Sequence, residues 1–308
     1  MLTKLRGQIY LLLGAFLFAF NGIISKIVLI DGLSAWRLTQ IRTGGAFVLL
    51  FAVYFTFRRH ELKPARDELP WLITFGVVGV TFVQAFYFVA IERMYVGVAL
   101  LIEFTAPIWI LLFLKFVLKK NVPVSLWYAI LLSFSGLLMI TQIWNGLSLD
   151  RIGLIAAFID ALALAGYFLI GDRLGKTKSS AAITTWGFGV ASAMLFFVLP
   201  IWNYPTEVFT KDMELLGRFN DYTLPGWVLI LWIVVMGTIA PYLFVVSGLK
   251  LLSAANASVF GMIEPVIAGV FAWWWLSESL NGIQMMGCVV VIVGIFIADK
   301  ARSKAGAH

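Results

Sequence analysis

The sequence predicts an all-α integral membrane protein, with ten transmembrane helices arranged as two inverted five-helix repeats. Of its 308 residues, 61% are hydrophobic and 13% are charged, whereas soluble domains average about 45–50% and about 25%. Apolar runs of about 20 residues, enough to cross a bilayer as a helix, recur along the whole chain. A proline and several glycines also recur at a constant offset of 158 residues. The first two observations predict the membrane helices, and the third predicts the repeat.

The apolar runs predict the spans in order. They are continuously apolar, which favours helices over a membrane β-barrel with alternating residues. Two connections are longer than the others: the polar segment 58–68, and the acidic segment 202–224, which has room for a surface helix. The opening MLTKLRG lacks a small-residue cleavage site, so we expect a first span and no cleaved signal. The expected spans are 7–30, 34–57, 69–91, 96–117, 124–143, 152–171, 181–201, 225–249, 254–276 and 282–298.

The distribution of Lys and Arg predicts the orientation. With the N-terminus inside, the inner segments hold sixteen of these residues and the outer segments hold four. Cytoplasmic loops carry the excess of positive charge in membrane proteins, so we expect both termini in the cytoplasm. Because the cations lie in short clusters beside apolar runs, the net charge of +7 indicates an anionic membrane surface and no nucleic-acid partner.

The internal repeat divides the chain into residues 1–145 and 146–308, both within one membrane domain. Proline and glycine constrain backbone geometry, so their coincidence is better evidence than apolar identities. A five-helix unit that starts inside ends outside, and its copy is therefore inverted. Such folds bind substrate near the membrane midplane between the halves, and work by alternating access. The matched pairs are Gly79 and Gly237, Phe86 and Phe244, Pro107 and Pro265, and Gly136 and Gly294.

Pro107 and Pro265 fall inside the fourth and ninth spans. Proline removes a backbone donor and interrupts a helix. Paired interruptions in corresponding helices of an inverted repeat indicate a transport site, so we expect these two helix breaks to act in gating. A kink that only improves helix packing is the alternative.

Five charged residues deep in the predicted spans need an explanation, because each costs about 2.5–3.5 kcal/mol at a helix centre: Lys26, Arg42, Glu103, Asp160 and Glu264. A structural interpretation pairs Arg42 with Glu103, or Lys26 with Asp160. A functional interpretation makes a carboxylate the proton or substrate site. Glu264 precedes a proline, and either satisfies polar groups at that break or couples transport to protons.

Polar and aromatic residues away from the helix ends predict a cavity with aromatic walls. Such a cavity suits a ligand with an apolar side chain and a small polar head. Arg42, the one deep arginine, would bind a substrate carboxylate, and aromatic faces or Glu103 would bind its ammonium. For any single aromatic residue, packing or lipid contact is the alternative. The expected substrate-binding residues are Asn21, Arg42, Gln84, Tyr87, Glu103, Trp109, Tyr167, Trp186 and Tyr242.

The two halves end in a similar pattern of small residues, a mid-helix proline, an acidic residue at the helix end and a glycine in the last helix. The first half departs from it, with Lys119 and Lys120 where the terminal acidic residue would stand, and otherwise keeps Arg42, Ala99, Pro107 and Gly136. The second half has Ala254, Ala257, Glu264, Pro265, Glu278, Gly287 and Gly294.

On these residues the chain resembles the drug/metabolite transporter superfamily, in its EamA-type ten-helix branch. Its length and style are most similar to bacterial amino-acid exporters of the YddG kind. The resemblance implies a secondary transporter of the bacterial inner membrane that exports aromatic or neutral amino acids, or similar small metabolites. Efflux of lipophilic cations or drugs is the alternative. A membrane-embedded lipid-handling enzyme is less favoured, because segment 202–224 is poor in nucleophiles and metal ligands.

The sequence holds no Walker-type glycine loop and no catalytic constellation. Its histidines, His60 and His308, fall in a loop and at the terminus, and its lone Cys288 cannot form an internal disulfide. We therefore expect no enzyme activity, no cofactor and no metal site. The expected partners are a small-molecule substrate and the lipid bilayer, with the protein as a monomer.

Overall fold

The computed structural model describes residues 2–94, 96–145 and 150–305. Within them, ten helical spans are long and apolar enough to cross a membrane, which confirms the predicted number. The predicted boundary between the repeats, after residue 145, falls at the edge of the segment that is not described. The spans are Leu2–Ile30, Ala35–Phe57, Leu69–Ile91, Val98–Val117, Val124–Thr141, Arg151–Leu174, Ser180–Val198, Gly226–Leu251, Ala254–Leu276 and Gly282–Lys300.

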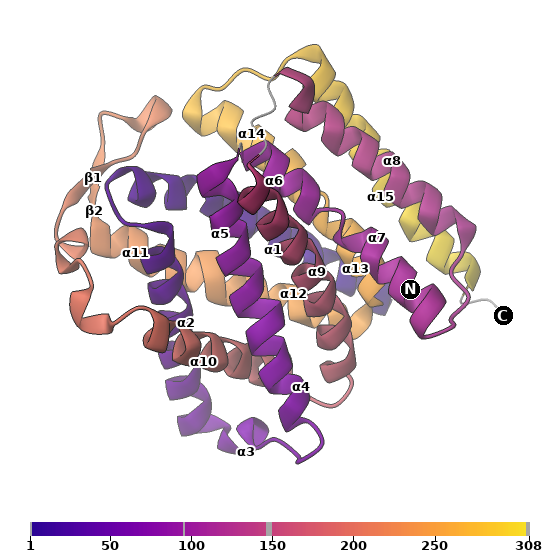
Figure 1. The fold of residues 1–308 in the computed structure, drawn as a ribbon, viewed down its shortest axis with the longest axis horizontal. Helices are drawn as coiled ribbons and strands as arrows, with labels where there is room; N and C mark the ends of the chain where they lie inside the picture. The colour runs from indigo at the N-terminus through magenta and orange to yellow at the C-terminus, as the bar shows by residue number, and fades with distance from the viewer. Residues whose placement is uncertain (1, 95, 146–149, 306–308) are drawn as a thin grey trace.

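Several spans consist of more than one helical segment, as Figure 1 shows for the fourth and ninth. The α-helices are α1 (Leu2–Ile30), α2 (Ala35–Phe57), α3 (Arg59–Leu62), α4 (Leu69–Thr74), α5 (Val83–Arg93), α6 (Val96–Glu103), α7 (Ala106–Leu112), α8 (Val124–Thr141), α9 (Arg151–Leu174), α10 (Ser180–Val198), α11 (Gly226–Val234), α12 (Ala240–Leu251), α13 (Ala254–Gly261), α14 (Glu264–Leu276) and α15 (Gly282–Ala305). The π-helical segments are η1 (Phe75–Phe82), η2 (Phe113–Val117) and η7 (Val235–Ile239). Short 3-10 turns are η3 (Ile143–Asn145), η4 (Ile201–Asn203), η5 (Thr206–Phe209) and η6 (Gly217–Phe219), and the strands are β1 (Asp212–Glu214) and β2 (Thr223–Pro225).

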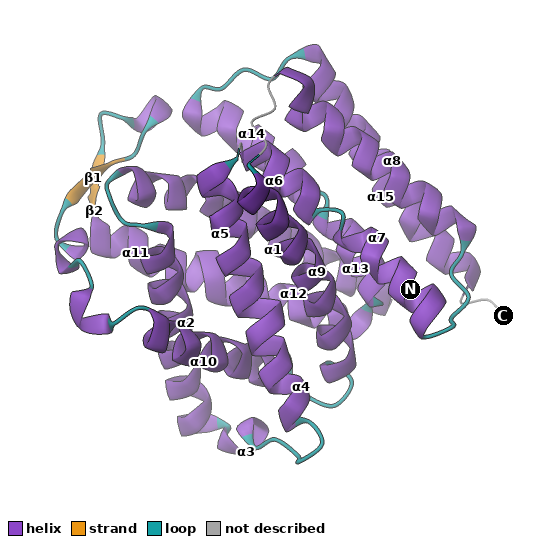
Figure 2. Ribbon diagram, viewed as in Figure 1, coloured by secondary structure: helices purple, strands orange, loops and turns teal. Residues whose placement is uncertain are grey.

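The two ends of the described chain lie side by side (Figure 1), and an ion pair of 2.7 Å joins Lys4 in α1 to Asp299 in α15. We call this end of the bundle the terminal face. The strands β1 and β2 lie at the opposite end, which we call the hairpin face (Figure 2).

Segment 202–224 forms no α-helix, although it has room for one. It forms 3-10 turns and an antiparallel hairpin in which Met213 lies opposite Leu224. Pro200 lies just before the segment and Pro205 near its start, and Leu216 adopts a positive φ of 60°. Proline lacks a backbone donor and a positive φ ends a helix, so local geometry favours turns here. The Met213 side chain is fully buried and anchors the hairpin on the bundle.

The fourth and ninth spans are broken at corresponding positions. The helix α6 ends two residues before α7 begins, and α13 ends two residues before α14 begins. The offset between the two breaks is the 158 residues of the sequence repeat. Even the turn hydrogen bonds correspond: Thr105 N–H donates to Ile102 O at 3.0 Å, and Ile263 N–H donates to Phe260 O at 3.2 Å.

Pro107 and Pro265 lie in the first turn of α7 and of α14. In that turn a missing N–H costs no helical hydrogen bond, so proline is favoured as a helix restarts. Each proline therefore lies just after its break, where a backbone N–H would have no acceptor in the restarting helix.

The last helices of the two halves, α8 and α15, pack together through symmetric close approaches. A Cβ on Gly136 would lie 2.7 Å from the Gly287 carbonyl oxygen, and one on Gly294 would lie 2.9 Å from the Ala129 carbonyl oxygen. Gly287 corresponds to Ala129 at the repeat offset, so the two contacts are copies of each other. This arrangement is the pseudo-two-fold symmetry of an inverted repeat.

Candidate functional site

The pseudo-two-fold axis passes between Gln84 and Tyr242. Gln84 Nε2 donates to the Tyr242 hydroxyl at 3.2 Å, and the two residues are 158 positions apart. Residues related by a two-fold operation can touch only at the axis, so this bond marks the centre of the molecule. Both side chains are buried, and Gln84 Oε1 has no hydrogen-bond donor.

Aromatic side chains surround this bond. The Tyr242 ring makes edge contacts with Phe18, Tyr167 and Phe188 at centroid distances of 5.4, 5.9 and 4.9 Å. Phe75 stacks on Tyr167 at 5.2 Å. The Tyr167 hydroxyl is buried without a partner. The axis therefore carries an aromatic cluster with two unpaired polar groups, Gln84 Oε1 and Tyr167 Oη.

Arg42 contacts the π-helical turn η7 of the eighth span. Its Nε donates to Thr238 Oγ1 at 3.0 Å and its Nη2 donates to the Gly237 carbonyl oxygen at 3.3 Å. A helical carbonyl normally accepts from the residue four positions on, but that residue is Pro241, which has no N–H. The arginine therefore supplies a donor that the backbone lacks.

The expected ion pair between Arg42 and Glu103 does not form. Within the described residues, no carboxylate lies within ion-pair distance of Arg42. Its acidic electrostatic partner is instead Glu264, at the start of α14. The backbone and Thr238 hold the guanidinium in place, because Pro241 leaves the Gly237 carbonyl without its helical partner.

The other expected pair, Lys26 with Asp160, is also absent. Lys26 Nζ lies 3.4 Å from Glu278 Oε1 at the hairpin face, and both side chains are about half exposed. Lys26 is four residues from the end of α1, so its long side chain reaches the membrane surface. Asp160 is 1% exposed, and neither of its carboxylate oxygens has a hydrogen-bond partner.

The charged groups of the site meet around Tyr87. This tyrosine interacts electrostatically with Glu103, Glu264, Asp160 and Arg42. Glu103 ends α6 and Glu264 begins α14, so the two helix breaks present their carboxylates toward one region. The site thus combines one cation and three carboxylates.

The remaining predicted site residues lie at different distances from this cluster. Asn21 packs against Gly237, and its Oδ1 has no donor. Trp109 lies at the fourth-span break, where its Nε1 donates to Thr105 Oγ1 at 3.0 Å. Trp186 lies apart from the cluster: its Nε1 donates at 2.9 Å to the carbonyl of Leu62, in α3.

Sequence reasoning missed Thr238, Phe18, Phe75 and Phe188. Thr238 binds Arg42 and also donates to the Ile233 carbonyl, five residues back, at 2.8 Å. A threonine followed three positions later by a proline was the available signal, because the proline leaves a carbonyl free in the preceding turn. Phe18, Phe75 and Phe188 have no comparable sequence signal, because nothing distinguishes them from the other phenylalanines among the 26 in the chain.

The cluster is covered on the side of the terminal face. There α7 packs against α13, and residues 254–260 of α13 are all buried. The symmetry-related pair on the other side is α6 and α14, and their described residues show no comparable packing. In α14 only Val266 is buried. Among the described residues, the broken helices therefore pack more closely toward the terminal face, through α7 and α13, than toward the hairpin face.

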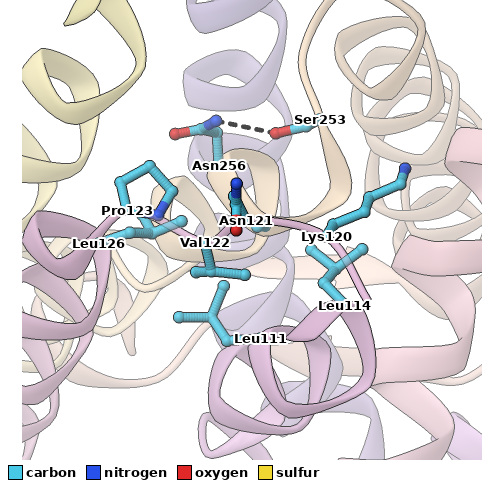
Figure 3. A pocket seen from close by; sticks show the side chains of 10 residues that line it. Leu111, Leu114, Lys120, Asn121, Val122, Pro123, Leu126, Ser253 and Asn256 are labelled. Carbon is cyan, nitrogen blue, oxygen red and sulfur yellow. Dashed lines mark hydrogen bonds between the residues drawn. The ribbon is translucent and has the colours of Figure 1, made fainter. Parts of the chain in front are cut away.

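A pocket of about 200 Å³ opens on the terminal face, outside this contact (Figure 3). At its edge Asn256 Nδ2 donates to Ser253 Oγ at 2.8 Å. Its lining includes Leu111 and Leu114 of the fourth span and Leu126 of the fifth. The pocket is separate from the cluster at the axis.

Comparison with known sequences accounts for the duplication. The profile of the EamA-like transporter family matches residues 5–142 and again residues 151–298. The chain belongs to the EamA-like transporter family. The two inverted five-helix halves of the structure are the two copies of that family unit, and the chain is a membrane transporter.

Relatives of this EamA-like transporter span nearly its whole length. It is 23% identical over 291 residues to the uncharacterized transporter YdfC of Bacillus subtilis, covering 92% of this chain and 87% of the relative. It is 24% identical over 311 residues to the uncharacterized inner membrane transporter YicL of Salmonella typhimurium, covering 98% of each. One solved crystal structure aligns with a TM-score of 0.75 over 96% of this chain and 98% of the other, at 16% identity. That likeness supports the fold alone.

Proposed function

We propose that this transporter exports aromatic or neutral amino acids, or similar small metabolites, across the bacterial inner membrane by alternating access. The observation that carries the proposal is the cluster at the pseudo-two-fold axis. It joins one deep arginine, the carboxylates of Glu103 and Glu264 and an aromatic wall at the point where both broken helices meet.

The chemistry of the cluster matches an amino acid in its zwitterionic form. The Arg42 guanidinium is hydrogen-bonded to neutral groups, Thr238 and the Gly237 carbonyl, and besides its electrostatic partner Glu264 it has further donors for a substrate carboxylate. Tyr87 and Glu103 lie in the same electrostatic neighbourhood, and suit an ammonium. The rings of Tyr167, Tyr242 and their neighbours would accept an apolar side chain.

Alternating access is supported by the unequal packing of the two broken helices. Contact of α7 with α13 covers the cluster toward the terminal face, while α6 and α14 stand apart. By the repeat symmetry, exchanging the two contacts would open the terminal face and cover the hairpin face. Breaks before Pro107 and Pro265 would let each half-helix move without breaking helical hydrogen bonds.

Counterflow in proteoliposomes tests the proposal. Vesicles containing the purified protein and unlabelled amino acid should take up labelled phenylalanine, methionine or threonine above vesicles without protein. Unlabelled substrate added outside should abolish the signal. Uptake equal to that of protein-free vesicles for all three amino acids would reject the amino-acid version.

Efflux of lipophilic cations is the second candidate, because three acidic residues and one arginine lie around Tyr87. Labelled tetraphenylphosphonium in the same vesicles separates the two functions. If tetraphenylphosphonium exchanges and the amino acids do not, the carboxylates bind the substrate. Arg42 then only hydrogen-bonds η7 and does not bind substrate.

A further inference from the structure

Asp160 is a buried acid, and no group in the described part of the chain stabilises its charge. It lies in the middle of α9, 1% exposed, with neither oxygen hydrogen-bonded. On its own helix it is flanked by the buried small residues Ala156, Ala157, Ala161 and Ala163. An ionised carboxylate in such surroundings needs donors or a counter-ion. Among the described residues Asp160 has neither, which favours its protonated form in this conformation.

Few of the elements that pack against α9 bring a charged or titratable group to Asp160. The segments α4, η1, α7 and α13 pack on α9 and contain no titratable residue. The helix α6 contributes Glu103, which is the electrostatic partner of Asp160. The titratable groups on α9 itself, α5 and α12 that lie in the cluster are the tyrosines Tyr167, Tyr87 and Tyr242.

Glu103 differs from Asp160 in its access. It is the last residue of α6, at the helix break, and is partly exposed on the side where α6 and α14 stand apart. Two neighbouring carboxylates in a water-poor site favour a state in which one proton is shared between them. Glu103 therefore stands between the enclosed Asp160 and the open side of the molecule.

Glu264 is placed differently. Glu264 is the acidic electrostatic neighbour of Glu103, but Arg42 compensates the negative charge of Glu264. The described residues also contain no group of three or more His, Cys, Asp or Glu side chains that could hold a metal ion. These two facts favour a proton over a metal cation as the coupling ion. They also favour the Asp160 and Glu103 pair over Glu264 as its binding site.

We propose that Asp160 and Glu103 form the proton site that couples substrate export to proton entry. The proposal rests on the transport function above. One proton reaches Asp160 from water at the open side by way of the Glu103 carboxylate, and after the helix contacts exchange it leaves Asp160 through Glu103 to water at the terminal face. No other reactant is needed, and no covalent bond of the chain other than O–H forms or breaks.

Vesicles with an acidic interior test the coupling. The membrane potential is held at zero with equal potassium on both sides and valinomycin. With a gradient of about one pH unit, one proton per substrate drives accumulation of up to about tenfold. The wild-type protein should accumulate labelled phenylalanine, while Asp160→Asn should only equilibrate it and still perform counterflow. Asp172→Asn, on the same helix but outside the cluster, should behave as the wild type.

Infrared spectroscopy tests the proton on Asp160 without any substrate. A protonated carboxyl group has a C=O stretch distinct from that of a carboxylate. The wild-type protein at neutral pH should show this band, and Asp160→Asn should lack it while Asp172→Asn keeps it.

The outcomes separate the two proposals. Counterflow without any effect of the pH gradient in the wild type rejects proton coupling and leaves the transport function standing. Absence of counterflow for every amino acid rejects the proposed substrate, and the infrared band then decides the proton site alone. If the wild-type protein lacks the band at neutral pH, Asp160 is ionised and the proposal is wrong.

Discussion

The Arg42 side chain has two roles, one in the structure and one in the proposed binding site. Its Nε and Nη2 complete the hydrogen bonding of η7, and its charge faces a site with three carboxylates. A guanidinium has five donors in a planar fork, so two bonds to the protein leave donors for a ligand.

Replacing Arg42 with Gln should reduce transport efficiency roughly ten- to hundredfold, because a hydrogen bond to a charged group contributes about 1.5–3 kcal/mol. Arg42→Lys should recover part of the loss, since it keeps the charge without the fork. Initial rates of counterflow at several substrate concentrations measure both. Arg37→Gln, at the hairpin-face end of the same helix, is the matched control. Equal loss in the control would show that the effect comes from α2 and not from the site.

Gly237 lies against Asn21, and a side chain there has no room. A Cβ on Gly237 would approach Asn21 Oδ1 to 1.9 Å. Gly237→Ala should therefore cost about 1–3 kcal/mol of overpacking and lower the melting temperature in detergent. Gly22→Ala is the control, because no atom lies within 4 Å of its added Cβ.

A double substitution identifies the cause of that destabilisation. If the clash is with the Asn21 amide, Asn21→Ala should restore most of the melting temperature lost in Gly237→Ala. No recovery would place the strain in the backbone of η7.

The sequence predicted most of these residues but not their partners. Arg42, Asp160 and Glu264 stand out because a charge inside an apolar run is costly and needs an explanation. Which groups form a hydrogen bond or an ion pair with that charge depends on helix rotation and on the position of a π-helical turn. Both are set by packing between distant segments, so the expected pairs of Arg42 with Glu103 and of Lys26 with Asp160 were wrong.

At the scale of elements, the connections on the terminal face are tied by an ion pair. Lys178 Nζ, in the connection between the sixth and seventh spans, lies 2.9 Å from Glu68 Oε2, before the third. Lys178 also donates to the Lys63 carbonyl and accepts, through its own carbonyl, from Lys250 Nζ. Lys178 thus joins its own connection to the connection before the third span and to the end of α12.

Burial opposes the charge of Glu68, but the Ala65 N–H and Lys178 outweigh it, so the pKa of Glu68 is lowered. A carboxyl whose pKa is lower in the folded protein stabilises it at pH values above the unfolded pKa of about 4.3. That contribution is lost as the pH falls through the folded pKa. The melting temperature should therefore fall below about pH 4.

Melting curves of Glu68→Gln against pH check this expectation. The variant should melt lower than the wild type at neutral pH and lose part of the acid dependence. Asp67→Asn, at the exposed neighbouring position, should follow the wild-type curve. An unchanged acid dependence in Glu68→Gln would assign it to other carboxylates.

Helix breaks are easier to predict than hairpins from one sequence. Pro107 and Pro265 act through their own missing N–H, which is a local effect. The hairpin of β1 and β2 depends on Met213 being buried against the bundle, which no local pattern shows. Local chemistry thus predicts where a span is interrupted, and tertiary packing decides what an outer connection becomes.

At the scale of the whole molecule, the charge distribution predicts that the terminal face is cytoplasmic. Single cysteines in a Cys288→Ser background test this with a membrane-impermeant maleimide on intact cells. Glu214→Cys, on the exposed hairpin, should be labelled directly. Arg59→Cys, exposed on the terminal side, should be labelled only after the membrane is permeabilised. The reverse pattern would invert the proposed orientation.

The hydrogen bond between Gln84 and Tyr242 has a consequence for the history of the fold. In a dimer of two identical antiparallel chains, a residue on the rotation axis meets its own copy, and only a self-complementary side chain fits there. Joining both halves in one gene removes that restriction. Each half can then vary alone, so that donor and acceptor become distinct and the two end states of the rocking motion acquire different energies. A transporter built this way can favour one resting state by changing a single residue at its centre.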